Sequence, residues 1–247
     1  MLSLIVRSGK SALASNEMYA LEQSSCFYGP VEVLFNSDRI EAKLVRQGLE
    51  VQSRAPFKEI LVASPSRHLV AKETFDLWIA LGASPMFYLQ QANDLPKDGP
   101  RNNVKSHDLQ CFSVTWAPRH EDGVLAITGG QSGNRPAMKM VQFQAEFLDS
   151  LTLPGGLHDF FLGLYRIGTV DNKLPIRFNI KYRQSEQLPL NTLSLRILKS
   201  PAAKFDDYRG YRIARLPDVV SSNGEQKMME QILTEMVIRP QNAATKH

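Results

Sequence analysis

The segment nearest to a catalytic motif is the glycine-rich stretch 130–134, Gly-Gln-Ser-Gly-Asn. A serine nucleophile of the α/β-hydrolase type lies in a Gly-x-Ser-x-Gly turn between a strand and a helix. Here Asn134 replaces the last glycine, and Arg135 and Pro136 follow where that helix would begin. The nearby Lys139 lies in an alternating, strand-like run, so a phosphate-binding loop is not indicated either. The sequence predicts a hairpin loop here, no catalytic residue, and a protein that is not an enzyme.

The histidines and cysteines do not form a metal-binding pattern. Structural zinc sites draw their ligands from close pairs of cysteines or histidines. The two cysteines, Cys26 and Cys111, are far apart in the sequence, and we interpret both as buried thiols whose redox state stays open. His120 precedes Glu121 and Asp122, a group typical of a polar turn. We expect no metal site and no cofactor.

Basic residues with interleaved aromatic residues suggest a binding function instead. Single-stranded nucleic acids bind grooves that combine positive charge with aromatic rings. The residues of this kind are Arg177, Lys181, Arg183, Tyr208, Arg209, Tyr211, Arg212 and Arg215. In the run 174–183, however, the aromatic residues alternate with the charges and so face the other way. We interpret this surface mainly as solvent-exposed and keep nucleic-acid binding as the second alternative.

The elements that position these residues are mostly strands. From residue 29 to 73, apolar and polar residues alternate in short runs separated by turn residues. This period of two indicates an antiparallel meander with one buried face. An apolar sheet face has to be covered or has to bind something. Similar alternation predicts further strands in 110–116, 124–128, 138–148, 174–183 and 190–199.

Several short helices and one long loop are expected between and around these strands. Helical spacing or the absence of breakers predicts helices near 16–25, 74–79 and 157–168. A C-terminal helix at about 224–237 follows a capping box that begins at Ser222. The stretch 91–108 is rich in Pro, Gly, Asn and Asp, which predicts a loop.

Composition is that of an ordinary globular chain. The 247 residues are 43% hydrophobic and 22% charged, enough to bury a core, and we expect one domain over 1–247. The 29 basic and 25 acidic residues permit an acidic partner without requiring one. No apolar run reaches the length of about 18 residues needed to span a membrane. The apolar stretch 2–6 is interrupted by Arg7 and Lys10 too early for a secretory signal.

Three short motifs resemble the LolA/LolB-type family of lipoprotein carriers, in an uncharacterised bacterial branch. They are 28–30 (Tyr-Gly-Pro), 53–58 (Ser-Arg-Ala-Pro-Phe-Lys) and 174–177 (Leu-Pro-Ile-Arg), and the resemblance covers most of residues 12–200. It implies an α+β fold in which a curved antiparallel sheet, an incomplete β-barrel, wraps around covering helices and holds acyl chains in an apolar cavity. The resemblance also implies the periplasm, given an export signal upstream; without one, we expect the cytoplasm.

The resemblance implies which side chains line the core or cavity. They are Val33, Phe35, Ile40, Leu44, Val141, Phe143, Phe178 and Ile180 on strands, with Trp78, Phe160 and Phe161 on helices. We therefore expect non-enzymatic binding or carriage of a lipid-like or lipoprotein acyl ligand. The first alternative is a structural or protein-interaction module whose sheet face is fully packed. Ligand identity, partner and oligomeric state stay open.

Overall fold

One large sheet dominates the fold. The computed structural model describes residues 11–12, 17–26, 28–81, 100–106, 109–116, 140–165, 169–182, 186–198 and 207–220. The strands in these residues are β1 (Ser11–Ala12), β2 (Met18–Ser25), β3 (Gly29–Phe35), β4 (Arg39–Leu44), β5 (Leu49–Arg54), β6 (Glu59–Ser64), β7 (Leu69–Thr74), β8 (Arg101–Ser106), β9 (Leu109–Trp116), β10 (Met140–Thr152), β11 (Lys173–Tyr182), β12 (Glu186–Leu198) and β13 (Arg212–Ile213). The α-helices are α1 (Phe75–Leu81), α2 (Leu157–Tyr165) and α3 (Leu216–Val220), and a 3-10 turn spans Pro65–Arg67.

The strands follow the order β13-β7-β6-β5-β4-β3-β2-β12-β11-β10-β9-β8, and β1 pairs with β10. Neighbours are antiparallel except for the short β1–β10 and β13–β7 pairs, which are parallel. The pairing of β2 with β12 joins the meander β2–β7 to the strands β8–β12. The described strands therefore make one continuous sheet whose ends, β8 and β13, do not meet.

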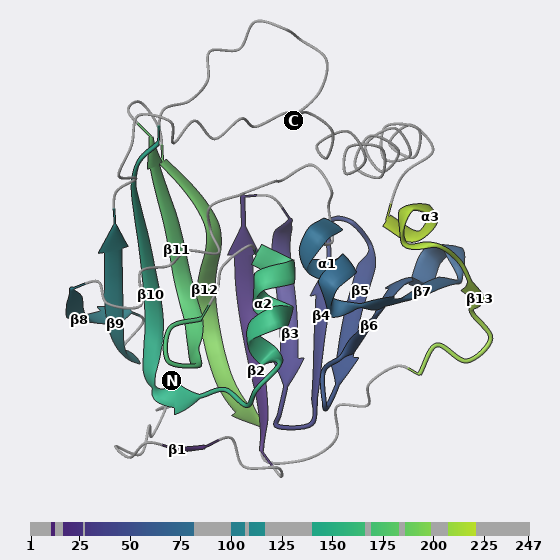
Figure 1. Ribbon diagram of the computed structural model, residues 1–247, viewed down its shortest axis with the longest axis horizontal. Coiled ribbons are helices and arrows are strands. Elements are labelled where there is room, and N and C mark those ends of the chain that lie inside the picture. The colour runs from purple at the N-terminus through teal and green to yellow at the C-terminus, as the bar shows by residue number, and fades with distance from the viewer. Residues whose placement is uncertain are drawn as a thin grey trace, which may run out of the picture.

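The sheet is curved, and α1 and α2 lie on the same face of it (Figure 1). We call the face that carries these helices the inner face, and the opposite one the outer face. This arrangement confirms the coarse prediction of a sheet-dominated α+β fold with a curved, unclosed antiparallel sheet. Helices contribute less than expected, since the three described ones have seven, nine and five residues.

Alternation along each strand decides which side chains reach the inner face. In β3, Val31, Val33 and Phe35 are buried whereas Pro30 and Glu32 are exposed. The antiparallel ladder then continues strand by strand from β3 to β7. This confirms the meander predicted from residue 29 onward. Burial of each large apolar side chain stabilises such a sheet by about 1.5–3 kcal/mol.

The helix predicted near 16–25 is wrong, because this segment forms strand β2. Glu17, Leu21 and Glu22 favour helices, but β2 is central in the sheet and bonds to β3 on one side and β12 on the other. Two ladders of backbone hydrogen bonds outweigh the small helix propensities of these side chains.

The loop predicted over 91–108 is wrong for residues 101–106, which form β8 and pair with β9. This strand lies at an end of the sheet, and Arg101, Asn102, Asn103 and Lys105 are exposed. An exposed edge strand buries little, so its sequence shows no apolar alternation. The rest of that predicted loop, the predicted strand 124–128 and the C-terminal helix predicted at about 224–237 lie outside the described residues. The single domain stays a prediction.

Candidate functional site

The side chains proposed to line a cavity lie together in one apolar core. Ten of the eleven are at most 3% exposed and belong to the same cluster of buried residues. They are Val33, Phe35, Ile40, Leu44, Trp78, Phe143, Phe160, Phe161, Phe178 and Ile180. Val141 is part of β10, but its side chain lies outside the described residues. The inner face is thus packed against its helices at the positions that were expected to meet a ligand.

Aromatic rings form much of this core. Phe143 of β10 stacks on Phe178 of β11 with ring centroids 5.9 Å apart. Phe160 and Phe161 of α2 meet edge to face at 6.1 Å. Such pairs add about 0.5–1.5 kcal/mol to the free energy of area burial. The rings also give the core broad apolar surfaces, against which an alkyl chain packs well.

Helix α1 brings Trp78 to the inner face. Thr74 ends β7, and its Oγ1 accepts a hydrogen bond from the Leu77 N–H (3.3 Å), which caps the helix. Phe75 and Trp78 point into the core, whereas Asp76 is exposed. The helix predicted around 74–79 is confirmed, with the indole of Trp78 fully buried.

Trp78 meets α2 at Gly163 in an unusually close approach. A Cβ atom added at Gly163 would lie 1.8 Å from Trp78 Nε1 and 1.9 Å from its Cδ1. Among the described residues, Trp78 Nε1 has no hydrogen-bond acceptor. A buried N–H without a partner costs about 1–3 kcal/mol. The core therefore holds one unsatisfied donor at the point where the two inner-face helices touch.

A short polar chain lies at the C-terminal end of α2. Tyr165 Oη donates to Gln23 Oε1 (2.7 Å), and Gln23 Nε2 donates to Thr192 Oγ1 (2.9 Å). All three side chains are buried. Burial, and then the neighbouring Tyr28, raise the pKa of Tyr165 well above its usual value. Tyr165 therefore stays a neutral donor that ties α2 to β2, and Gln23 ties β2 to β12.

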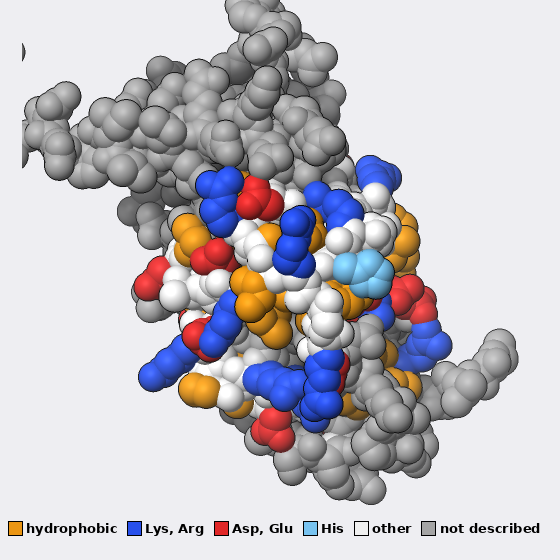
Figure 2. All heavy atoms as spheres, turned by 90° about the vertical axis from the view of Figure 1, so that its right-hand side faces the viewer, with side chains coloured by type: hydrophobic (Ala, Val, Ile, Leu, Met, Phe, Trp, Pro, Cys, Tyr) orange, Lys and Arg blue, Asp and Glu red, His pale blue; other side chains and the backbone are white. Residues whose placement is uncertain are grey.

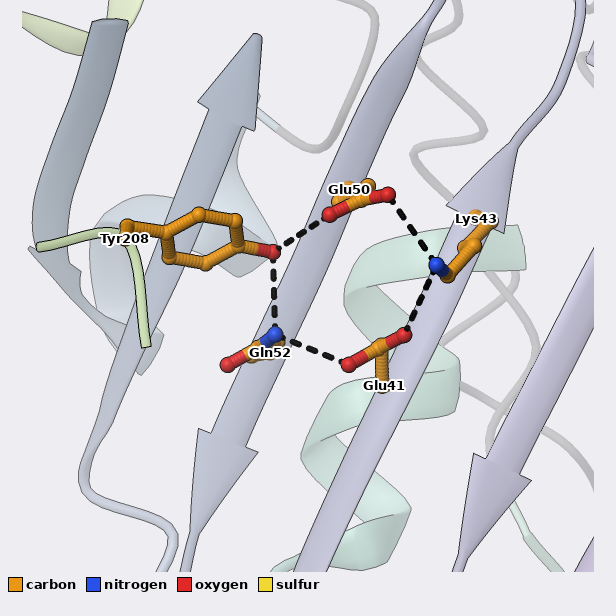
Figure 3. Close-up of polar contacts among 5 residues, drawn as sticks. All are labelled: Glu41, Lys43, Glu50, Gln52 and Tyr208. Atoms are coloured by element: carbon orange, nitrogen blue, oxygen red, sulfur yellow. Dashed lines mark hydrogen bonds and ion pairs between the residues drawn. The ribbon is translucent and has the colours of Figure 1, made fainter. Parts of the chain in front are cut away.

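A second polar cluster lies on the outer face and was not predicted. Lys43 Nζ lies 3.5 Å from Glu41 Oε1 and 3.2 Å from Glu50 Oε1. Gln52 Nε2 donates to Glu41 Oε2 (2.8 Å) and to Tyr208 Oη (2.9 Å), and Tyr208 Oη donates to Glu50 Oε2 (2.9 Å). Figure 3 shows these five side chains as a closed ring, with α2 behind the sheet. We call these five residues the outer-face ring.

Only part of the outer-face ring could be found from sequence. Strand alternation places Glu41 and Lys43 on one face of β4, and the register pairs them with Gln52 and Glu50 of β5. Tyr208, however, is 156 residues from Gln52, and no local pattern links the two. Its aromatic and basic neighbours suggested exposed binding residues, whereas Tyr208 is itself buried.

The two aromatic side chains considered for nucleic-acid binding, Tyr208 and Tyr211, already contact other side chains. Tyr208 is held in the outer-face ring, and the ring of Tyr211 lies edge-on to His68 with centroids 5.2 Å apart. In the antiparallel register, Arg177 of β11 lies opposite Glu146 of β10. On the side of the molecule that carries β7 and β13, basic side chains are interspersed with acidic and hydrophobic ones (Figure 2). Arg183 lies outside the described residues.

The two cysteines are free, and we expect both to react slowly with thiol reagents. Cys111 is buried as predicted, but Cys26 is exposed, which corrects the expectation that both are buried. Desolvation nonetheless raises the pKa of each thiol to about 11, and for Cys111 the carboxylate of Glu146 adds to the shift. The thiolate is the reactive form, so a raised pKa lowers the rate at neutral pH.

At pH 8 the thiolate fraction should be about two orders of magnitude below that of an ordinary cysteine with a pKa of about 8.5. Alkylation of the native protein by iodoacetamide, followed by mass spectrometry between pH 7 and 11, checks this. We expect the rate to rise up to about pH 11, whereas the protein in denaturant should label fast at pH 8. Fast labelling of the native protein at pH 8 would contradict the assignment.

In the described part of the chain, no helix is both long and apolar enough to cross a membrane. Likewise, no group of three or more His, Cys, Asp or Glu residues in these segments is arranged to hold a metal ion. The expectations that the protein is not an enzyme and has no cofactor stay predictions.

Comparison with known proteins gives little further guidance. No protein-family model matches the chain, and no curated protein sequence is similar to it. Among solved structures, the chain is similar to an uncharacterized conserved protein from Thermus thermophilus, with 7% sequence identity and a TM-score of 0.41. The match covers 81% of this chain and 91% of that chain.

Proposed function

We propose that the protein binds a lipid-like ligand, a free lipid or the acyl group of a lipoprotein, between the inner face of the sheet and the helices α1 and α2. In this proposal the curved sheet acts as an incomplete β-barrel of the LolA/LolB type. Its aromatic core supplies the apolar surface, since each buried methylene group of an acyl chain gains about 0.8 kcal/mol. The ligand would take the place of helix contacts, so α2 moves away from Trp78 when a chain enters.

The observation that carries this proposal is the unsatisfied indole N–H of Trp78. It lies in an otherwise apolar core, at the contact between α1 and α2. An ester, amide or carboxylate oxygen of a lipid would accept this hydrogen bond and remove the cost of the unpaired donor. Binding would then gain from both apolar contact and one directed polar contact, which is the usual composition of a small-molecule site.

Native mass spectrometry of the protein purified without detergent, followed by solvent extraction of bound lipid, tests the proposal. We expect mass increments that correspond to acyl-containing lipids, recovered in the extract. The variant Trp78→Phe keeps an aromatic ring but lacks the N–H, and it should carry less lipid while remaining folded. Ligand-free protein both after purification and after incubation with lipid vesicles would contradict the proposal.

A second candidate function is a structural or protein-interaction module. The packing of the inner face favours it, because the ten described candidate side chains are at most 3% exposed. A fully packed face needs no ligand, and such a protein would act through its surface. The same mass spectrum separates the two functions, since this module would stay at the mass of the bare chain under every condition.

A further inference from the structure

The segment 207–220, which we call the edge strap, passes around the β7 edge of the sheet. Tyr208 lies on the outer face, in the outer-face ring. β13 then runs parallel to the start of β7, where Arg212 N donates to His68 O (2.8 Å) and Ala214 N donates to Val70 O (2.9 Å). Helix α3 ends the strap and packs on β6 and β7, the same two strands that carry α1 (Figure 1).

The α3 end of the strap lies on the inner face. Glu73 of β7 is paired in register with Ile60, a core residue, so its side chain points to the inner face. Leu216 and Val219 are fully buried and belong to the same core cluster as Trp78. The strap therefore covers the inner face beside α1, at an end of the unclosed sheet.

Polar contacts hold the strap at two points. At its start, Tyr208 is only 8% exposed, and its Oη makes two hydrogen bonds in the outer-face ring. At its end, Arg67 Nη1 donates to Asp218 O (3.0 Å) and Nη2 donates to Val219 O. A basic side chain at the last carbonyls of a helix satisfies them and interacts favourably with the helix dipole.

We propose that the edge strap is a releasable cover over the β7 edge of the inner face, and that the hydroxyl of Tyr208 holds it closed. The strap joins the sheet through a two-residue strand and a five-residue helix, too short to be stable on their own. Segments at the edge of a fold that form only such short elements can open locally while the rest of the protein stays folded. An opened strap exposes the inner face, where the acyl ligand would enter. This role in ligand access rests on the proposed function.

Amide hydrogen exchange of the unaltered chain and of Tyr208→Phe tests the opening directly, without any lipid. Loss of the two hydroxyl hydrogen bonds should accelerate exchange in peptides covering 207–220 about tenfold, with no change in β2 and β3. Tyr211→Phe is the matched control. Tyr211 belongs to the same strap and its ring lies edge-on to His68, a contact that phenylalanine keeps, so this variant should exchange at the rate of the unaltered chain. Arg67→Ala removes the other anchor and should also accelerate exchange.

Stopped-flow uptake of a fluorescent fatty acid tests the access role on the same proteins. Uptake should be about tenfold faster in Tyr208→Phe than in Tyr211→Phe, because access scales with the fraction of open strap. Unchanged exchange in both Tyr208→Phe and Arg67→Ala overturns the proposal, and so does accelerated exchange with unchanged uptake. If the unaltered chain takes up no fatty acid, the proposed function fails, and the exchange rates then decide alone whether Tyr208 holds a strap that opens.

Discussion

Replacement of Gly163 with alanine is expected to lower the free energy of unfolding by about 1–3 kcal/mol. In most helices this change raises stability by up to about 1 kcal/mol, because alanine has the higher helix propensity. Here the added Cβ would lie 1.8 Å from Trp78 Nε1, closer than any van der Waals contact allows. Either α1 or α2 has to shift, and the packing of Trp78 is lost. The sign of the effect is therefore opposite to the one that propensity alone predicts.

Urea unfolding followed by circular dichroism measures this change. Gly155 is the matched control, because a Cβ added there meets nothing within 4 Å, and Gly155→Ala should alter stability by less than about 0.5 kcal/mol. In a Trp78→Ala background the clash is absent, so Gly163→Ala should then be neutral or stabilising. A similar loss of stability with and without the Trp78 side chain would show that the helix contact is not as described.

Replacement of Phe178 with alanine is expected to cost about 3–5 kcal/mol, the largest single loss that we anticipate. Phe178 is fully buried in β11, and its ring stacks on Phe143 of the neighbouring strand. Its removal leaves a cavity between strands that lie far from the meander in sequence. Lys181, exposed on the same strand, provides the control, and Lys181→Ala should change stability little.

The unfolding of Phe178→Ala also tests whether the chain is one domain. Trp78 lies on the meander side of the sheet and is the only tryptophan left in a Trp116→Phe background. If the β2–β12 pairing makes the sheet one cooperative unit, the loss of stability caused by Phe178→Ala should also lower the midpoint of the unfolding transition reported by Trp78 fluorescence. A Trp78 transition that does not move would mean that the two parts of the sheet unfold independently.

The local sequence pattern was sufficient to predict the strands of the meander β3 to β7, but not strands β2 and β8. A period of two with turn residues between the runs identifies β3 to β7, because these strands carry most of their apolar side chains on one face. The segment of β2 was predicted as a helix because it contains no Gly or Pro, and only pairing on both sides makes it a strand. β8 was missed because an exposed edge strand carries no apolar alternation. Both failures come from tertiary contacts that a local window does not contain.

In the candidate site, too, some features could be predicted from the sequence and others depend on three-dimensional contacts. Alternation and helical spacing placed Phe178 and Trp78 on apolar faces, and the family resemblance assigned them to the core or cavity. They gave no information on the contact between Trp78 and Gly163, which depends on how two helices distant in sequence cross. The outer-face ring likewise needs Tyr208 to fold back on β5. The alternation pattern thus predicts many of the buried apolar residues, while three-dimensional contacts decide which of them carry an unsatisfied polar group or anchor another segment.

Quenching of Trp78 by a brominated fatty acid tests most directly whether the inner face binds an acyl chain. In the Trp116→Phe protein all tryptophan emission comes from Trp78, and bromine quenches only at close contact. We predict saturable quenching by the brominated chain, with the unbrominated fatty acid competing for the same site. Binding of the fatty acid that leaves the emission of Trp78 unchanged, or no saturable binding at all, would contradict an acyl site between the sheet and its helices.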